Sequence, residues 1–302
     1  KIFKMKGLVI KTVGNLYNVQ VKDKIYKCNY RGKYKLSNNF SNPIVSGDIV
    51  EIIINDEETG IIEEIHDRKN YFLKKSLKDN KAHIIASNID QTLIMGSIKS
   101  PYTKLKFIDK CIAASLYYEI KPIVLFNKID LLNKKEEKKL REISSIYKNL
   151  NIEFISISIK KKINMVEISK KLKNHKTLLI GNSGIGKSSL INFLTGVKNQ
   201  RTDKLSTKTG RGKQTTTFSE IFNIKNNGLV IDTPGFKDFY FHDIKKSDLK
   251  FLYPEFKTKN NQCKFNNCNH LNEPGCIIKE NIGKTISERR YNNYLSIIDE
   301  LD

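Results

Sequence analysis

The spacing of apolar residues changes along the chain and separates it into three regions. In residues 1–67, short runs alternate apolar and polar positions, which is typical of strands with one buried face. Turn residues such as Gly14-Asn15 and Asp23-Lys24 separate these runs. Five short strands without a helical pattern predict an all-β barrel; an oligonucleotide-binding (OB) barrel is the natural candidate, and an SH3-like barrel stays open. The predicted strands cover residues 7–13, 16–21, 25–28, 48–54 and 60–65.

Residues 68–240 show a different pattern, in which continuous apolar runs alternate with helical stretches such as 104–119 and 135–150. Strands buried on both faces produce such runs, so the region predicts an α/β domain with a parallel sheet covered by helices. Two further runs, 218–224 and 228–231, predict a hairpin. The continuous apolar runs are residues 91–95, 122–126, 152–155 and 177–180.

Residues 241–302 form the third region, a small and mostly α-helical domain with few large apolar side chains. Thr285-Ile-Ser-Glu288 matches the capping-box pattern and predicts the start of a final helix. The apolar face of this helix is predicted to pack rather than to react. Its members are Tyr291, Tyr294, Leu295, Ile298 and Leu301.

A phosphate-binding loop lies between a predicted strand and a predicted helix of the central region. The segment fits G-x-x-x-x-G-K-[ST], in which glycines let backbone N–H groups approach an anion closely. The following helix adds the positive end of its dipole. Lys187 is expected to reach the β- and γ-phosphates, and Ser188 to bind Mg²⁺. The loop residues are Gly181, Asn182, Ser183, Gly184, Ile185, Gly186, Lys187, Ser188 and Ser189.

A second motif, Asn127-Lys128-Ile-Asp130, follows the predicted strand 122–126 and selects guanine. A carboxylate at the end of a strand can accept hydrogen bonds from N1–H and the N2 amino group of guanine, which adenine lacks. Asn127 and Lys128 are expected to brace the loop and cover the base. Ser156 and Ser158, after the next strand, are expected to contact the base as well.

Two candidate switch segments complete the nucleotide site. Residues 196–217 have no usable periodicity and end in three threonines. One of Thr215, Thr216 and Thr217 is expected to add a hydroxyl to Mg²⁺ once the γ-phosphate is present. Asp232 is expected to hold Mg²⁺ through water, and the N–H of Gly235 to meet the γ-phosphate. Phe236 stands where many GTPases have a water-orienting glutamine, which predicts slow hydrolysis unless another group or a partner supplies that function.

The order of these motifs is unusual, because the guanine motif precedes the phosphate loop. The chain ends of such a domain lie close together, so a sheet can keep its geometry when they are joined and the chain is opened elsewhere. The order therefore predicts a circularly permuted GTPase domain.

Three cysteines and a histidine lie close together in the last region, at Cys263, Cys268, His270 and Cys276. This spacing fits a closed tetrahedral Cys₃His zinc site that would stabilise a domain with little apolar core. Cys28 and Cys111 stand alone and are expected to be small core residues.

The net charge of +22 indicates a polyanionic partner. It is concentrated in residues 68–240, which contain 34 Lys and Arg but only 14 Asp and Glu. A solvated surface is the alternative explanation. In the barrel region four tyrosines alternate with basic residues, so they could stack on bases, although half of them could equally be core. These are Tyr17, Tyr26, Tyr30 and Tyr34.

No apolar run approaches the ~18 residues of a membrane span, and a cytoplasmic protein is expected.

Taken together, the motifs resemble the circularly permuted, small-ribosomal-subunit-dependent GTPases of bacteria over essentially the whole chain. The resemblance implies an N-terminal OB barrel, a permuted GTPase domain that binds GTP with Mg²⁺, and a C-terminal module with one structural Zn²⁺. It also implies a role late in 30S assembly, with binding to 16S rRNA near the decoding region, release of an assembly factor and a monomeric state. The motifs are Asn127–Asp130, Gly181–Ser189, residues 210–217, residues 232–235 and the Cys263/Cys268/His270/Cys276 spacing.

One position departs from this family, which usually has a histidine where Gln214 stands. The histidine is a candidate for orienting the attacking water, and the amide of Gln214 is predicted to take that role. Two alternatives stay open. One is a nucleotide-gated RNA-binding module with incidental hydrolysis, and the other is a permuted GTPase that acts on the large subunit.

Overall fold

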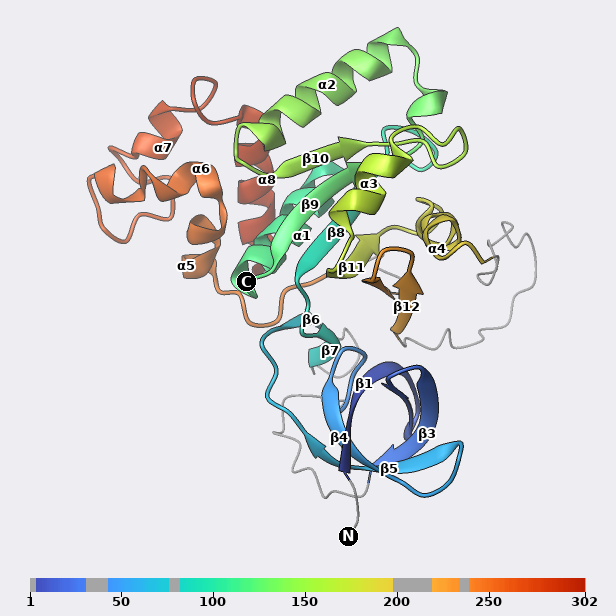
Figure 1. Cartoon of the computed structure of the whole chain (residues 1–302). Coiled ribbons are helices and arrows are strands. Elements are labelled where there is room, and N and C mark those ends of the chain that lie inside the picture. The colour runs from blue at the N-terminus through green and yellow to red at the C-terminus, as the bar shows by residue number, and fades with distance from the viewer. Residues whose placement is uncertain (1–3, 31–42, 76–81, 198–218, 234–238, 302) are drawn as a thin grey trace, which may run out of the picture.

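The computed structural model describes residues 4–30, 43–75, 82–197, 219–233 and 239–301. These residues form a β-barrel, a central α/β domain and a C-terminal helical module (Figure 1). None of the described helices is long and apolar enough to cross a bilayer.

The barrel consists of five strands that close in the order β1-β2-β3-β5-β4 and return to β1. Strands β3 and β5 are parallel, and the other pairs are antiparallel. Alternate residues such as Val9, Val19 and Ile52 are fully buried, as the alternating pattern requires. The predicted OB-like barrel is thereby confirmed. Its strands are β1 (Lys4–Val13), β2 (Leu16–Val21), β3 (Lys24–Tyr30), β4 (Ile49–Ile54) and β5 (Thr59–Ile65).

The central domain has five parallel strands in the order β10-β9-β8-β11-β13, followed by antiparallel β12. Each predicted strand is present with shifts of one or two residues at its ends. The strands are β8 (Gln91–Gly96), β9 (Lys121–Phe126), β10 (Glu153–Ser156), β11 (Lys176–Gly181), β12 (Glu220–Ile224) and β13 (Gly228–Asp232).

Helices cover both faces of this sheet. Side chains of α1 and α2 join one buried cluster, and side chains of α3 and α4 join another. The alternation of apolar runs and helical stretches predicts a helix where α3 lies, although no bounds were predicted for it. The helices are α1 (Leu105–Tyr117), α2 (Lys134–Lys148), α3 (Met165–Lys171) and α4 (Lys187–Thr195), with a 3₁₀ turn, η1, at Ile129–Leu131.

A small hairpin between the barrel and the sheet was not predicted. Strands β6 (Tyr71–Lys75) and β7 (Ala82–Ser87) pair with each other in a separate antiparallel sheet. The ring of Phe72 on β6 lies 5.6 Å from that of Phe239 and 5.8 Å from that of Tyr118. The hairpin therefore packs on the central domain.

The barrel meets the central sheet at β1 and β12, so that eleven strands form one continuous sheet. Lys11 of β1 is paired with Glu220 of β12, and their side chains form an ion pair at 3.0 Å. Nearby, the Ser46 hydroxyl donates a hydrogen bond of 2.6 Å to the carbonyl of Ser219. These contacts join the barrel to the hairpin that carries Asp232.

The C-terminal module consists of short helices and ends in α8, which packs against α1 (Figure 1). The capping-box prediction is wrong. Helix α8 is present, but it begins at Glu288 after the N-cap residue Ser287, which makes no side-chain cap hydrogen bond, so Thr285 lies two residues before the cap. The helices are α5 (Lys246–Leu249), α6 (Pro254–Lys257), α7 (Ile277–Glu280) and α8 (Glu288–Ile298), with 3₁₀ turns η2 (Lys250–Leu252), η3 (Asn260–Gln262) and η4 (Asp299–Leu301).

The buried face of α8 includes Arg290, which is 2% exposed, in addition to the predicted Tyr291, Tyr294 and Ile298. The Arg290 guanidinium pairs with Asp109 of α1 and donates to both carboxylate oxygens of Glu255, at 2.5 and 3.1 Å. A buried charge is stable only when such partners surround it. The cluster therefore holds the C-terminal module on α1.

Replacing Arg290 by methionine should lower the free energy of unfolding by about 3–5 kcal/mol, because two buried carboxylates lose their cation. Urea titration followed by circular dichroism and tyrosine fluorescence measures this change. Arg289→Met is the matched control, since the neighbouring Arg289 is exposed and its loss should cost roughly 0.5 kcal/mol or less. Equal transition midpoints for the two variants would contradict the assigned role of the cluster.

Candidate nucleotide-binding site and metal centre

The phosphate loop connects the end of β11 at Gly181 to the start of α4 at Lys187. Gly184 and Gly186 have φ angles of +74° and +108°, which favour glycine. A Cβ on Gly186 would also lie 2.5 Å from Asn127 Nδ2. The glycine at 186 thus allows the guanine motif to approach the phosphate loop.

Asn127 and Lys128 both contact this loop. Asn127 Nδ2 donates to the carbonyl of Ile185 at 2.9 Å, and its Oδ1 accepts from the Ile159 amide at 3.3 Å. Lys128 Nζ donates to the carbonyl of Gly184 at 2.8 Å. The two motifs, distant in sequence, are brought together into one site.

Asp130 lies in η1 beyond β9, half-buried, and its Oδ1 accepts from the Ser158 hydroxyl at 2.5 Å. Ser158 is fully buried and its Oγ also accepts from the Lys161 amide at 3.0 Å. These bonds fix the direction of the Asp130 carboxylate. Ser156 ends β10, where its carbonyl accepts from Asn164 Nδ2 at 2.8 Å.

Lys187 and Asp232 lie on the phosphate side of the site. Lys187 Nζ donates to the carbonyls of Gly181 at 2.7 Å and Asn182 at 3.2 Å. Burial lowers the pKa of Lys187, and the charge of Asp232 opposes that change. Burial raises the pKa of Asp232, and Lys187 opposes that change in turn. The two groups therefore stabilise each other's charged forms.

The Oδ1 atom of Asp232 is buried and has no hydrogen-bond partner among the described residues. A buried carboxylate oxygen without a partner is costly unless a cation or its water satisfies it. Ser188 and Ser189 are half-buried in the first turn of α4. Asp232 together with the Ser188 hydroxyl fits a hydrated Mg²⁺.

Four predicted site residues, Gln214, Thr215, Thr216 and Gly235, lie outside the described residues. The same holds for Phe236, Tyr34 and the basic segment from Lys198 to Lys213. Their roles stay predictions.

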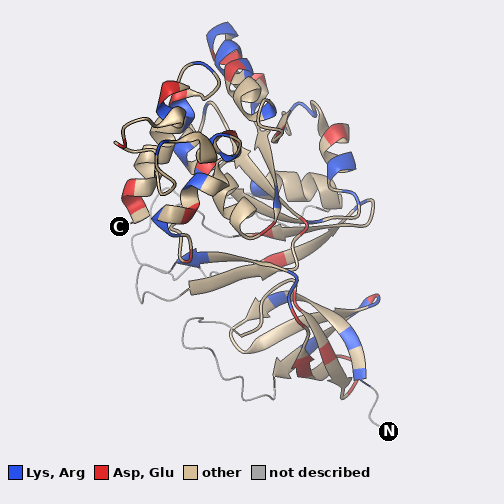
Figure 2. Ribbon diagram, turned by 90° about the vertical axis from the view of Figure 1, so that its left-hand side faces the viewer, with Lys and Arg blue, Asp and Glu red and all other residues tan. Residues whose placement is uncertain are grey.

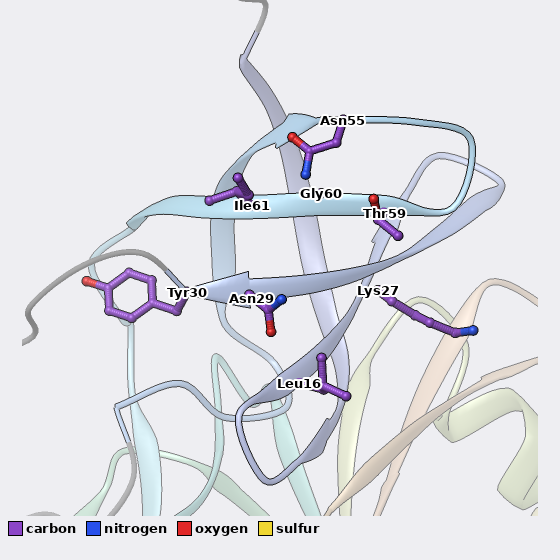
Figure 3. A pocket seen from close by; sticks show the side chains of 8 residues that line it. All are labelled: Leu16, Lys27, Asn29, Tyr30, Asn55, Thr59, Gly60 and Ile61. Carbon is purple, nitrogen blue, oxygen red and sulfur yellow. The ribbon is translucent and has the colours of Figure 1, made fainter.

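The barrel carries a cavity of about 520 Å³ on the surface formed by β3 and β5 (Figure 3). Lys27, Asn29 and Tyr30 follow one another along β3 at its wall. Tyr17 and Tyr26, in contrast, are buried in the barrel core. Two of the four tyrosines are thus core residues, in agreement with the alternative that half of them belong to the barrel core. The cavity is lined by Leu16, Lys27, Asn29, Tyr30, Asn55, Thr59, Gly60 and Ile61.

The metal-ligand candidates converge in the C-terminal module. All four are buried, and their ligand atoms lie within 4.8 Å of one another. His270 Nδ1 is 3.7, 3.4 and 3.4 Å from the sulfurs of Cys263, Cys268 and Cys276. Zinc bond lengths of ~2.3 Å to sulfur and ~2.05 Å to nitrogen require a separation of about 3.6 Å in a tetrahedron. The geometry fits one zinc ion.

The surroundings of the cluster prepare it for a metal. Asn260 Oδ1 accepts from His270 Nε2 at 2.8 Å, which leaves Nδ1 facing the cysteines. Burial lowers the pKa of His270 to about 4, so that the imidazole is neutral, and raises the pKa of Cys268 to about 12. A bound cation would offset this cost by stabilising the thiolates.

Two tyrosines that the apolar pattern predicted to pack also support this centre. Tyr291 donates to the carbonyl of His270 and Tyr294 to that of Asn269, each at 2.7 Å. Both are buried. The apolar pattern alone did not indicate this supporting role. The tyrosine hydroxyls could have indicated it, because a buried tyrosine needs a hydrogen-bond partner and a buried phenylalanine does not.

Comparison with known proteins agrees with these features. The family described as RsgA GTPase matches residues 65–242, and the one described as RsgA N-terminal domain matches residues 6–62. The protein of Bacteroides thetaiotaomicron named small ribosomal subunit biogenesis GTPase RsgA 2 is 37% identical over 300 residues, covering 98% of this chain and 97% of its own length. A relative from Bacteroides fragilis, named small ribosomal subunit biogenesis GTPase RsgA, is 38% identical over 301 residues.

Solved structures are similar over the whole chain. The crystal structure of YjeQ from Thermotoga maritima has a TM-score of 0.79 at 31% identity and covers 99% of both chains. That of YloQ, described as a circularly permuted GTPase, has a TM-score of 0.75 at 23% identity and supports the fold alone. The permuted fold is therefore confirmed, and the chain belongs to the RsgA family of GTPases.

Proposed function

We propose that this GTPase acts in the biogenesis of the small ribosomal subunit, which it recognises by binding 16S rRNA. Its membership of the RsgA GTPase family makes it a GTP hydrolase with Mg²⁺ as the metal of its substrate. The names of the relatives support the choice of the small subunit over the large one. We further propose that the protein is a cytoplasmic monomer and that GTP hydrolysis drives the release of an assembly factor.

The observation that carries the proposal is the contact between the guanine motif and the phosphate loop, from Asn127 Nδ2 to the Ile185 carbonyl. It supports one site for a whole guanine nucleotide. In this site Asp130 selects the base, and Ser158 orients Asp130. Lys187 and the amides of residues 181–189 bind the phosphates.

Bound Mg²⁺ would neutralise charge on the β- and γ-phosphates. The Oδ1 atom of Asp232, which has no hydrogen-bond partner among the described residues, supports the place of this ion, with Ser188 and Thr216 as the hydroxyl ligands. Gln214 orients the attacking water, and the Gly235 amide binds the γ-phosphate. The roles of Gln214, Thr215, Thr216 and Gly235 rest on the sequence.

Binding to rRNA is supported by charge and by the barrel. The net charge of +22 favours a polyanion. OB barrels bind nucleic acids over strands 2 and 3 and the adjoining loops. The cavity beside β3 has this position and combines Lys27 with the aromatic ring of Tyr30 (Figure 3). Stacking on Tyr30 and a phosphate contact from Lys27 would suit single-stranded rRNA.

Purified 30S subunits should stimulate GTP turnover by about tenfold or more, because Phe236 replaces the usual water-orienting glutamine and Gln214 would need the bound subunit to orient the water efficiently. Phosphate release is measured with 30S subunits, with 50S subunits and with the protein alone. No stimulation by 30S would contradict the proposal, and stimulation by 50S alone would favour the large-subunit alternative. If the Gln214→Ala variant of the protein dissociates from 30S subunits as the wild type does, hydrolysis is incidental to its binding cycle.

A further inference from the structure

Three consecutive lysines lie beside the guanine-selecting residues, and their side chains take no part in the site described above. Lys160, Lys161 and Lys162 are all exposed in a turn that leads from β10 to α3. We name residues 159–163 the lysine loop. A β-bridge joins Ile163, at the end of this loop, to Ser158, the residue that precedes the loop.

Hydrogen bonds hold the lysine loop in one shape. The Ile163 amide donates to the Ser158 carbonyl at 2.9 Å, and the Lys161 amide donates to the Ser158 hydroxyl at 3.0 Å. At the start of the loop, the Ile159 amide donates to Asn127 Oδ1. The backbone of the lysine loop is thus tied to the nucleotide site, whereas the ammonium groups of the three lysines form no hydrogen bond with the described residues of that site.

The charge of the lysine loop is not balanced locally. Within the described part of the chain, Lys160, Lys161 and Lys162 form no ion pair, whereas nearby Lys171 binds Glu153 at 2.7 Å. Three consecutive exposed lysines on a backbone held by hydrogen bonds concentrate positive charge at one place on the surface. Such an arrangement is favourable when a row of negative charges binds to it.

We propose that the lysine loop binds the phosphate backbone of RNA beside the base of the bound guanine nucleotide. The proposal rests on the proposed function, which makes rRNA the polyanion that the protein meets. Lysines on flexible stems suit phosphates, because they bind as point charges without reading sequence. The Ser158 hydroxyl accepts a hydrogen bond from the Lys161 amide of the lysine loop and donates one to Asp130. The side chain of Ser158 therefore connects the loop proposed to bind RNA with the residue proposed to bind guanine.

The experiment compares the full chain with a triple variant, Lys160→Ala, Lys161→Ala and Lys162→Ala. Binding to purified 16S rRNA is measured by filter retention at several salt concentrations. Each lost phosphate contact should reduce the slope of log Kobs against log salt by ~0.7–0.9, so we expect a change of about 2 and at least about tenfold weaker binding at low salt. Basal GTP turnover should stay unchanged, which shows that the variant is folded.

A charge-matched control replaces Lys134, Lys138 and Lys148 by alanine. These lysines are exposed on α2, where acidic residues lie among the basic ones (Figure 2). Equal losses in both triple variants would overturn the proposal, since net charge alone would explain them. An unchanged slope would also overturn it, and so would weaker binding to 30S subunits with unchanged binding to 16S rRNA, which indicates a ribosomal protein as the partner.

The wild-type chain separates this proposal from the proposed function. If 30S stimulates the wild type and the lysine-loop variant binds 16S rRNA normally, only the lysine-loop proposal fails. If the wild type neither responds to 30S nor binds 16S rRNA, the proposed function fails first.

Discussion

Asp130→Asn should weaken GTP binding by about 10³-fold or more and should make xanthosine triphosphate the better substrate. Sites built to hydrogen-bond a polar group reject analogues that leave it unpaired by about 10⁴–10⁵-fold. The asparagine amide places a donor against the N2 amino group of guanine, which is itself a donor. Xanthine has a carbonyl oxygen there and accepts the new hydrogen bond. Fluorescent GDP and XDP analogues measure both affinities.

Ser158→Ala is the matched control for this exchange. It removes the 2.5 Å bond to Asp130 Oδ1 but keeps the carboxylate, so nucleotide affinity should fall by roughly 1 kcal/mol without a change of base preference. An unchanged preference of Asp130→Asn for guanine would show that another group reads the base.

Removal of zinc should unfold the C-terminal module while the rest of the protein stays folded. Structural zinc stabilises small zinc-finger peptides by about 10–16 kcal/mol, and the candidate ligands Cys263, Cys268 and Cys276 are all buried in the C-terminal module. The protein should contain one zinc per chain. After a strong chelator is added, amide hydrogen exchange should become fast in residues 241–302.

Two cysteine variants test the assignment of the ligands. Cys268→Ala should lose the zinc, whereas Cys28→Ala should keep one zinc per chain, because Cys28 is buried in the barrel core. Slow exchange across α8 after complete loss of zinc would contradict a structural role of the metal.

The barrel and the central sheet could be predicted because their strands carry strong patterns. Strand β2 lies at Leu16–Val21, as its alternation predicts, and the fully buried run of β8 follows from its continuous apolar residues. The hairpin β6–β7 escaped prediction, because Tyr71–Lys75 ends in two lysines and does not alternate. Helix α3 is only seven residues long, too short for a clear helical period.

The chemistry was predictable where it depends on spacing within one segment, as in the phosphate loop and the Cys₃His cluster. Contacts between distant segments were not. Nothing in the sequence pairs Arg290 with Asp109, which lies 181 residues earlier, or directs Asn127 to the phosphate loop. Such contacts depend on how helices and strands pack, and the apolar pattern indicates only which faces are buried.

Strand β12 is the edge strand of the central sheet on the side of the barrel, and the barrel covers part of its edge. Lys11 pairs with Glu220 there, and Asn223 Nδ2 donates to Gln20 Oε1 of β2 at 3.3 Å. A sheet edge without a neighbour offers its backbone groups to other chains and favours aggregation. By covering this edge, the barrel contributes to solubility. We expect the central domain to self-associate when it is produced without the barrel.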